Sequence, residues 1–152
     1  MILTVVLVVT GCDRKTIYHH YVHTPKVGWE KNDILFFDVP PVSHSAVLHE
    51  EIGLRISQAY PFLGLSLIVQ QEVIAADGST NRNIVRTDTL KCSLYDEDGN
   101  PKGKGIGYYQ YSFHLTDLSV NEKDSLHITV RHNMRREILQ GIVDVGILLR
   151  QY

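Results

Sequence analysis

Residues 63–70 read Leu-Gly-Leu-Ser-Leu-Ile-Val-Gln, and this stretch decides the fold class. Leucine or valine stands at every odd position, whereas the even positions hold glycine, serine, isoleucine and glutamine. A period of two places successive side chains on opposite faces of a β-strand. The segment is therefore predicted to be a strand with one apolar face directed toward a core.

The same alternation recurs along the rest of the chain. Its apolar positions are Leu35, Phe37 and Val39; Ile52, Leu54 and Ile56; Tyr109, Tyr111, Phe113 and Leu115; Leu126, Ile128 and Val130; and Val143, Val145, Ile147 and Leu149. Turn residues separate the runs, as in Asp77-Gly78-Ser79 and Asp98-Gly99-Asn100-Pro101. The one helix candidate is 134–140, followed by Gly141. We predict an all-β sandwich of about seven to eight mostly antiparallel strands with at most one short helix.

Composition fits one ordinary folded domain. The chain has 152 residues, of which 43% are hydrophobic, and its 15 Lys and Arg against 17 Asp and Glu give a net charge of −2. Because phosphate binding requires a basic field, nucleic acid is not an expected partner. Two cysteines, Cys12 and Cys92, cannot form a disulfide-stapled scaffold or a four-thiolate zinc site. Cys92 shares a strand face with Leu90 and Leu94, so we expect a buried thiol.

The N-terminus resembles a bacterial lipoprotein signal. Residues 2–10 are almost entirely apolar and are too few to span a bilayer. The sequence Val9-Thr10-Gly11-Cys12 resembles a lipobox, in which the cysteine thiol accepts a diacylglyceryl group. The alternative is a buried N-terminal strand, but the run does not alternate and ends abruptly in charged residues.

Three segments follow from this interpretation. Residues 1–11 are expected to be the signal segment, 12–28 the lipidated cysteine and a tether, and 29–152 the β-sandwich domain. Fully extended, the tether of residues 13–28 could reach roughly 50 Å, at about 3.3 Å for each residue.

No pattern of reactive residues identifies an enzyme or a metal site. Histidines at positions 19, 20 and 23 lie in the expected tether, where solvated side chains are the simplest interpretation. His49-Glu50-Glu51 lacks the second histidine of a helical zinc motif, and no Gly-x-Ser-x-Gly element is present. We therefore expect a protein without catalytic activity, cofactor or metal.

Aromatic residues give the candidate binding surface. Trp29, Tyr60, Tyr108, Tyr109 and Tyr111 are candidates for contact with a ligand or partner, because exposed rings mark sugar-binding and protein-binding surfaces. Tyr108 should point away from the face of Tyr109 and Tyr111. The competing interpretation is that most of these rings fill the core of the sandwich.

The order of several short segments gives the chain a family resemblance. These segments are Cys12-Asp-Arg-Lys-Thr-x-Tyr, Gly28-Trp-Glu-Lys-Asn-Asp before Leu35-Phe-Phe, Leu54-Arg, Tyr60-Pro-Phe, Asp88-Thr-Leu, Asp98-Gly with Gly103-Lys-Gly-Ile-Gly, and Gly141-Ile-Val-Asp-Val-Gly-Ile. In this order the chain resembles the gliding-motility lipoprotein family GldH of Bacteroidota.

The resemblance implies a lipoprotein held in the outer membrane by fatty-acyl chains such as palmitate on Cys12, on either the periplasmic or the surface face. It implies a structural or interaction role beside envelope proteins of a motility or type IX secretion apparatus. It implies no catalytic residue. A glycan-binding or peptide-binding sandwich on the cell envelope is the alternative function.

Overall fold

The computed structural model describes residues 15–79 and 83–152. Their strands are β1 (Thr16–His23), β2 (Trp29–Glu30), β3 (Leu35–Val39), β4 (Ala46–Ser57), β5 (Gly64–Ile74), β6 (Ile84–Ser93), β7 (Tyr108–Val120), β8 (Ser125–His132), β9 (Ile138–Leu139) and β10 (Ile142–Gln151). No helix forms in this described part of the chain, and therefore none that could cross a bilayer.

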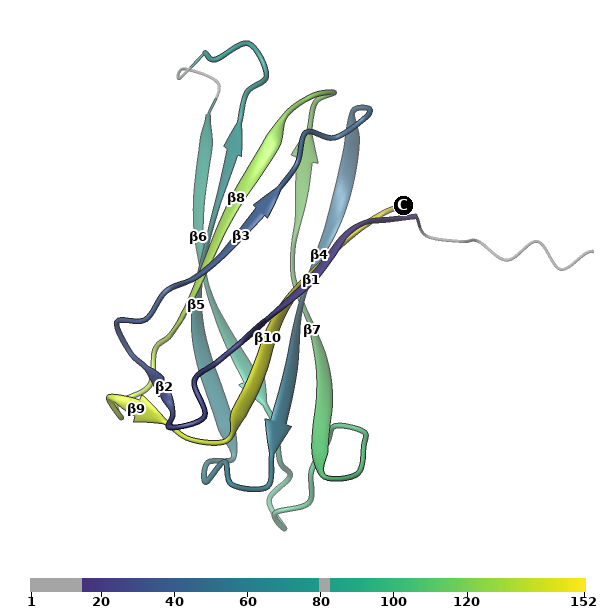
Figure 1. Cartoon of the computed structure of the whole chain (residues 1–152). Helices are drawn as coiled ribbons and strands as arrows, with labels where there is room; N and C mark the ends of the chain where they lie inside the picture. The colour runs from purple at the N-terminus through teal and green to yellow at the C-terminus, as the bar shows by residue number, and fades with distance from the viewer. Residues whose placement is uncertain (1–14, 80–82) are drawn as a thin grey trace, which may run out of the picture.

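Eight of these strands form two four-stranded sheets. Sheet I has the order β1-β10-β4-β7 and sheet II the order β3-β8-β5-β6, while β2 and β9 form a separate two-stranded ladder. Every recorded pairing is antiparallel. Figure 1 shows the two sheets as layers, with β1 and β3 on the near side and the β2–β9 ladder at one end. The predicted all-β fold is confirmed.

The core lies between the two sheets and uses the alternating positions that the sequence indicates. Residues that are at most 1% exposed include Phe37 in β3, Ile52 in β4, Leu67 in β5, Ile128 in β8 and Ile147 in β10. Each fully buried side chain of this size contributes about 1.5–3 kcal/mol relative to leaving it in water.

Irregular pairing accounts for a break in this alternation in β10. Val143 was expected on the apolar face, but it is only half-buried, whereas Ile142 is 4% exposed. The register shifts between Ile142 and Asp144, so an extra residue moves the apolar positions by one.

The predicted helix over 134–140 is wrong. Its last residues form β9, which pairs with β2 through Trp29 opposite Leu139. Both of these side chains are at most 1% exposed. A segment of about two helical turns has little stability by itself, so burial of Leu139 against the core decides its conformation.

The expected tether is also corrected. Residues 16–23 form β1, an edge strand of sheet I paired with β10 from Thr16 opposite Arg150 to His23 opposite Asp144. The folded domain therefore begins before Trp29. Alternation in β1 is obscured because histidines and tyrosines occupy both faces of an edge strand that is covered on one side only.

A polar contact crosses the core between the sheets. Glu50 of β4 is fully buried, and its Oε2 accepts a hydrogen bond of 3.1 Å from Nε2 of Gln71 in β5. Oε1 of each side chain is buried without a hydrogen-bond partner. Burial raises the pKa of the Glu50 carboxyl to about 7.

Candidate functional site

The structure places three of the five candidate aromatic residues in the core. Trp29 is fully buried and donates a 2.8 Å hydrogen bond from Nε1 to the carbonyl of Asp33. Tyr60 is 4% exposed and donates to the carbonyl of Gly64, and Tyr111 is 8% exposed and donates to that of Leu94. Their polar atoms are thus satisfied inside the sandwich, and little of these rings is accessible to a ligand.

The remaining two candidates lie near one end of β7. Tyr108 is 43% exposed, whereas Tyr109 is half-buried with its ring edge-on to that of Tyr95. The expected opposite orientation of these neighbours therefore holds. Of the five candidate rings, Tyr108 is thus the one that is exposed.

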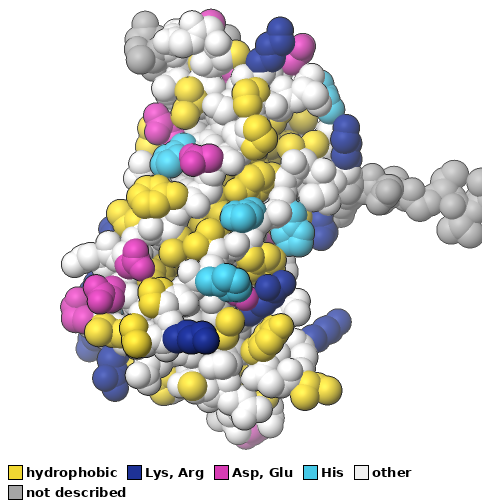
Figure 2. All heavy atoms as spheres, in the orientation of Figure 1, with side chains coloured by type: hydrophobic (Ala, Val, Ile, Leu, Met, Phe, Trp, Pro, Cys, Tyr) yellow, Lys and Arg dark blue, Asp and Glu magenta, His cyan; other side chains and the backbone are white. Residues whose placement is uncertain are grey.

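The outer face of sheet I instead carries a connected set of polar contacts. Strand register brings residues of β1, β10, β4 and β7 into rows across this sheet. The rows are His23, Asp144, Arg55 and Gln110; Tyr21, Gly146, Gly53 and Ser112; and His19, Leu148, Glu51 and His114. Figure 2 shows histidine side chains gathered along the line that β1 follows in Figure 1.

The middle row is built to hold the ring of Tyr21. A Cβ on Gly146 would lie 2.6 Å from the ring carbon Cδ1, and a Cβ on Gly53 would lie 2.8 Å from Cζ. Two neighbouring strands therefore lack side chains where the tyrosine lies across them. The guanidinium of Arg55 lies over the ring, 4.3 Å from its centroid, in a cation–π contact.

A buried carboxylate fixes Arg55 in this position. Nη1 of Arg55 donates to Oδ2 of Asp144 at 3.2 Å, and Nδ1 of His23 contacts Oδ1 of the same side chain. Asp144 is only 2% exposed. Because a buried carboxylate requires a charged partner, these contacts hold one end of the outer face in a defined conformation.

An open depression of about 920 Å³ lies beside Tyr21. It is lined by His19, Tyr21, Leu148 and Arg150 from β1 and β10, by residues 110–113 of β7, and by Ser93 and residues 102–105. Lys102, Lys104 and Arg150 give it three cationic side chains. Such a surface suits a polar or acidic segment of a partner molecule.

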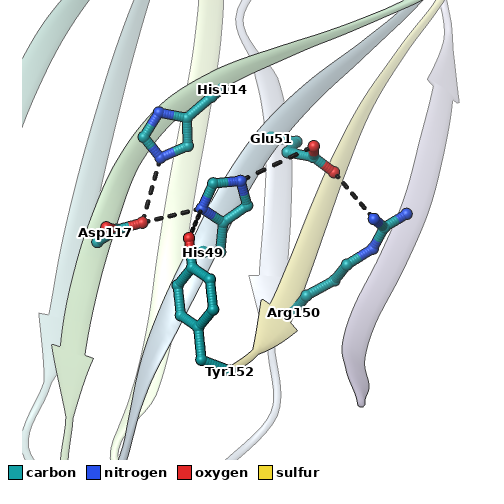
Figure 3. A network of polar contacts seen from close by, with 6 residues as sticks. All are labelled: His49, Glu51, His114, Asp117, Arg150 and Tyr152. Carbon is teal, nitrogen blue, oxygen red and sulfur yellow. Dashed lines mark hydrogen bonds and ion pairs between the residues drawn. The ribbon is translucent and has the colours of Figure 1, made fainter. Parts of the chain in front are cut away.

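At the far end of the same face, two histidines share a carboxylate (Figure 3). Oδ1 of Asp117 lies 3.0 Å from Nδ1 of His49 and 3.1 Å from Nε2 of His114. The two imidazole rings are stacked, with centroids 4.1 Å apart and planes inclined by 17°. The hydrogen bonds from His114 and His49 lower the pKa of Asp117.

A β-bulge makes this cluster possible. Residues three apart in a regular strand point to opposite faces, yet His114 and Asp117 lie on the same face of β7. His49 pairs with Asp117 and Glu51 pairs with His114, so β7 has one residue more than β4 in this interval.

Sequence reasoning missed the cluster although a signal was present. Apolar residues of β7 stand at odd positions as far as Leu115 and at even positions from Leu118 to Val120. Such a change of parity inside one strand indicates a bulge.

The described residues include only one of the two cysteines. Cys12, the expected lipidation site, lies outside the described residues. Cys92 is 2% exposed, as expected, and burial raises the pKa of its thiol to about 12.

The fold and this surface define a class: a small antiparallel β-sandwich with one structured polar face. A model of the GldH lipoprotein family matches residues 16–149, from the start of β1 almost to the end of β10. The chain therefore belongs to the GldH lipoprotein family. The gliding motility lipoprotein GldH of Flavobacterium johnsoniae is 27% identical over 158 residues, covering 99% of this chain and 94% of the relative.

Solved structures show only distant similarity. An aminopeptidase from a marine sediment archaeon (Thaumarchaeota archaeon) covers 82% of this chain at 8% identity and a TM-score of 0.40. An α-amino acid ester hydrolase covers 93% at 6% identity and a TM-score of 0.41. The chain spans only 26% and 31% of these two proteins.

Proposed function

We propose that this chain is a non-catalytic, lipid-anchored envelope protein that acts as an interaction component of a gliding-motility apparatus. The observation that carries the proposal is the relation to the Flavobacterium johnsoniae lipoprotein over 99% of the chain. The lipobox-like sequence ending at Cys12 supports acylation at that residue, and outer-membrane localisation is part of the proposal.

The position of β1 gives this anchor a geometry. The backbone amide of Gln151 donates to the carbonyl of Lys15 at 2.9 Å, so the described chain begins beside its own C-terminus. Cys12 precedes Lys15 by three residues, which span at most about 10 Å when extended. A lipid on Cys12 would hold this end of the sandwich close to the bilayer, not at the end of a long tether.

We assign the partner-binding surface to the outer face of sheet I. This face combines Gly146 and Gly53, the Tyr21 ring that lies across them, and the adjoining cationic depression. Because these parts are already held in place, the surface needs little reorganisation when a partner binds. A protein partner with a polar or acidic contact segment fits this surface. A glycan remains the second candidate, because Tyr108 is exposed and the depression carries polar side chains.

The anchor and the surface are tested separately. Cys12→Ala is expected to move the protein from the membrane fraction to the soluble fraction, whereas the matched Cys92→Ala variant should stay with the membrane. Retention of Cys12→Ala in the membrane fraction would contradict the anchor.

A photocrosslinking residue at Ser112, on the outer face of sheet I, should capture a motility or secretion component from native envelopes. The matched position is exposed Thr87 in β6 of sheet II. Equal capture from both positions would refute the assignment of the surface. Binding to immobilised glycans without protein capture would favour the second candidate.

A further inference from the structure

The cluster at the far end of the outer face has the chemistry of a metal site. Two imidazole nitrogens and a carboxylate oxygen converge from two neighbouring strands, and these three ligand atoms lie within 4.8 Å of one another. Neutral imidazole and carboxylate are ligands that zinc accepts, and three protein ligands with one open position form a common zinc arrangement.

The contacts to Asp117 are close to the spacing around one small cation. Zinc bonds of about 2.0–2.2 Å place tetrahedral ligand atoms about 3.4 Å apart. Oδ1 of Asp117 lies 3.0 Å and 3.1 Å from the two histidine nitrogens, so these two separations need to grow by only a few tenths of an ångström. The stacked imidazole rings must also swing apart, so that each directs its nitrogen at the ion.

The groups behind His49 provide a second and independent observation. A histidine that binds metal through one nitrogen usually directs the other toward a carboxylate, which orients the ring. Nδ1 of His49 faces Asp117, and its Nε2 lies 3.8 Å from Oε1 of Glu51. Oε2 of Glu51 is in turn 3.7 Å from Nη1 of Arg150, as Figure 3 shows.

The surroundings also allow entry and a fourth ligand. The side chain of His49 is 14% exposed, whereas those of His114 and Asp117 are each 48% exposed. The Tyr152 hydroxyl lies 2.7 Å from Nδ1 of His49, so an oxygen already lies beside one of the three ligand atoms. The site is thus held from the strand side and open toward solvent.

We propose that His49, His114 and Asp117 bind one Zn²⁺ ion, with water or the Tyr152 hydroxyl as the fourth ligand. The ion joins β4 to β7 across the bulge and lies at the end of the sandwich where Thr16 pairs with Arg150. This assignment does not depend on the proposed function, because it rests only on the geometry of these side chains.

The test uses the full chain in detergent, purified without a histidine tag. Zn²⁺ is titrated by calorimetry, and Co²⁺ serves as a spectroscopic probe whose visible absorption reports tetrahedral nitrogen and oxygen ligands. We expect one metal ion per chain. His49→Gln, His114→Gln and Asp117→Asn should each weaken binding at least as much as the roughly 10–100-fold typical of losing an outer-shell partner.

Matched variants distinguish this site from other histidines. Nδ1 of His127 lies 2.5 Å from Oδ1 of Asp38 on sheet II, and this pair contains a single histidine. His127→Gln should therefore leave zinc affinity unchanged. Glu51→Gln is expected to weaken binding about 10-fold while leaving all three ligands in place. Circular dichroism of each variant verifies that it is folded.

Three results would overturn the proposal. The first is absence of zinc or cobalt binding to the folded chain. The second is equal affinity in the wild type and in folded His49→Gln, His114→Gln and Asp117→Asn. The third is loss of binding only when the β1 histidines at 19 and 23 are replaced.

Discussion

Replacing Glu50 by glutamine should stabilise the protein, and the gain should grow as pH rises. The carboxyl has an ordinary pKa of 4.5, and burial between the sheets raises it to about 7 in the folded protein. Below pH 4.5 the folded and unfolded chains are both protonated at this residue. Between the two values the folded state retains a proton that the unfolded state has released, so stability falls as pH rises. Above pH 7 both states are ionised and the loss is complete.

The expected loss follows from the two pKa values. At about 1.4 kcal/mol for each pH unit between them, ionised Glu50 costs the folded state about 3 kcal/mol at pH 8 and about 1 kcal/mol at pH 5. Glu50→Gln keeps the size of the side chain and removes the charge. It also introduces an N–H donor beside Gln71, whose Oε1 is buried without a partner.

The assay is urea unfolding of both proteins at pH 5 and pH 8. With a urea dependence of about 1–3 kcal/mol per molar, the midpoint of Glu50→Gln should exceed that of the wild type by about 1–3 M at pH 8. Every other ionisable group is common to both proteins, so its contribution cancels in the difference. Glu97→Gln, in an exposed turn, is the matched control and should show no such dependence. A stability difference that is the same at both pH values would refute the reasoning.

Two further predictions concern Tyr21 and Cys92. Gly53→Val should destabilise the protein by about 1–3 kcal/mol, because the new side chain occupies the space of the Tyr21 ring. Measured by urea unfolding, this loss of stability should be smaller when Tyr21 is also replaced by alanine, and an unchanged loss would contradict the contact. In a Cys12→Ala variant, Cys92 should react with a thiol reagent at pH 8 only after unfolding, because burial raises the pKa of its thiol to about 12. Rapid reaction of the folded protein would contradict the burial of Cys92.

Alternation in the sequence predicts the core strands, because burying one face of a strand requires an apolar side chain at every second residue. Leu65, Leu67 and Val69 are all at most 2% exposed, as the pattern indicates. Leu63 belongs to the same pattern but is 58% exposed, since it precedes the first residue of β5. An alternating pattern therefore predicts which face of a strand is buried more reliably than it predicts where the strand begins and ends.

Other features depend on contacts between distant segments. Residues 16–23 carry too little apolar alternation to be recognised as a strand, and only the free edge of β10 makes them one. Trp29 and Tyr60 lie outside the alternating runs, so the sequence does not indicate which way their rings face. The structure buries both with their polar atoms bonded to backbone carbonyls.

Pairing of β1 with β10 also constrains how the protein is made. Tyr18 lies opposite Leu149, so the first strand of the described residues pairs with the last, and β10 is an interior strand between β1 and β4. Sheet I therefore cannot be completed before residues 142–151 have been synthesised. Contacts of such sequence separation form slowly because the loop must close first. We therefore expect the β1–β10 pairing to form after shorter-range pairings such as that of β5 with β6.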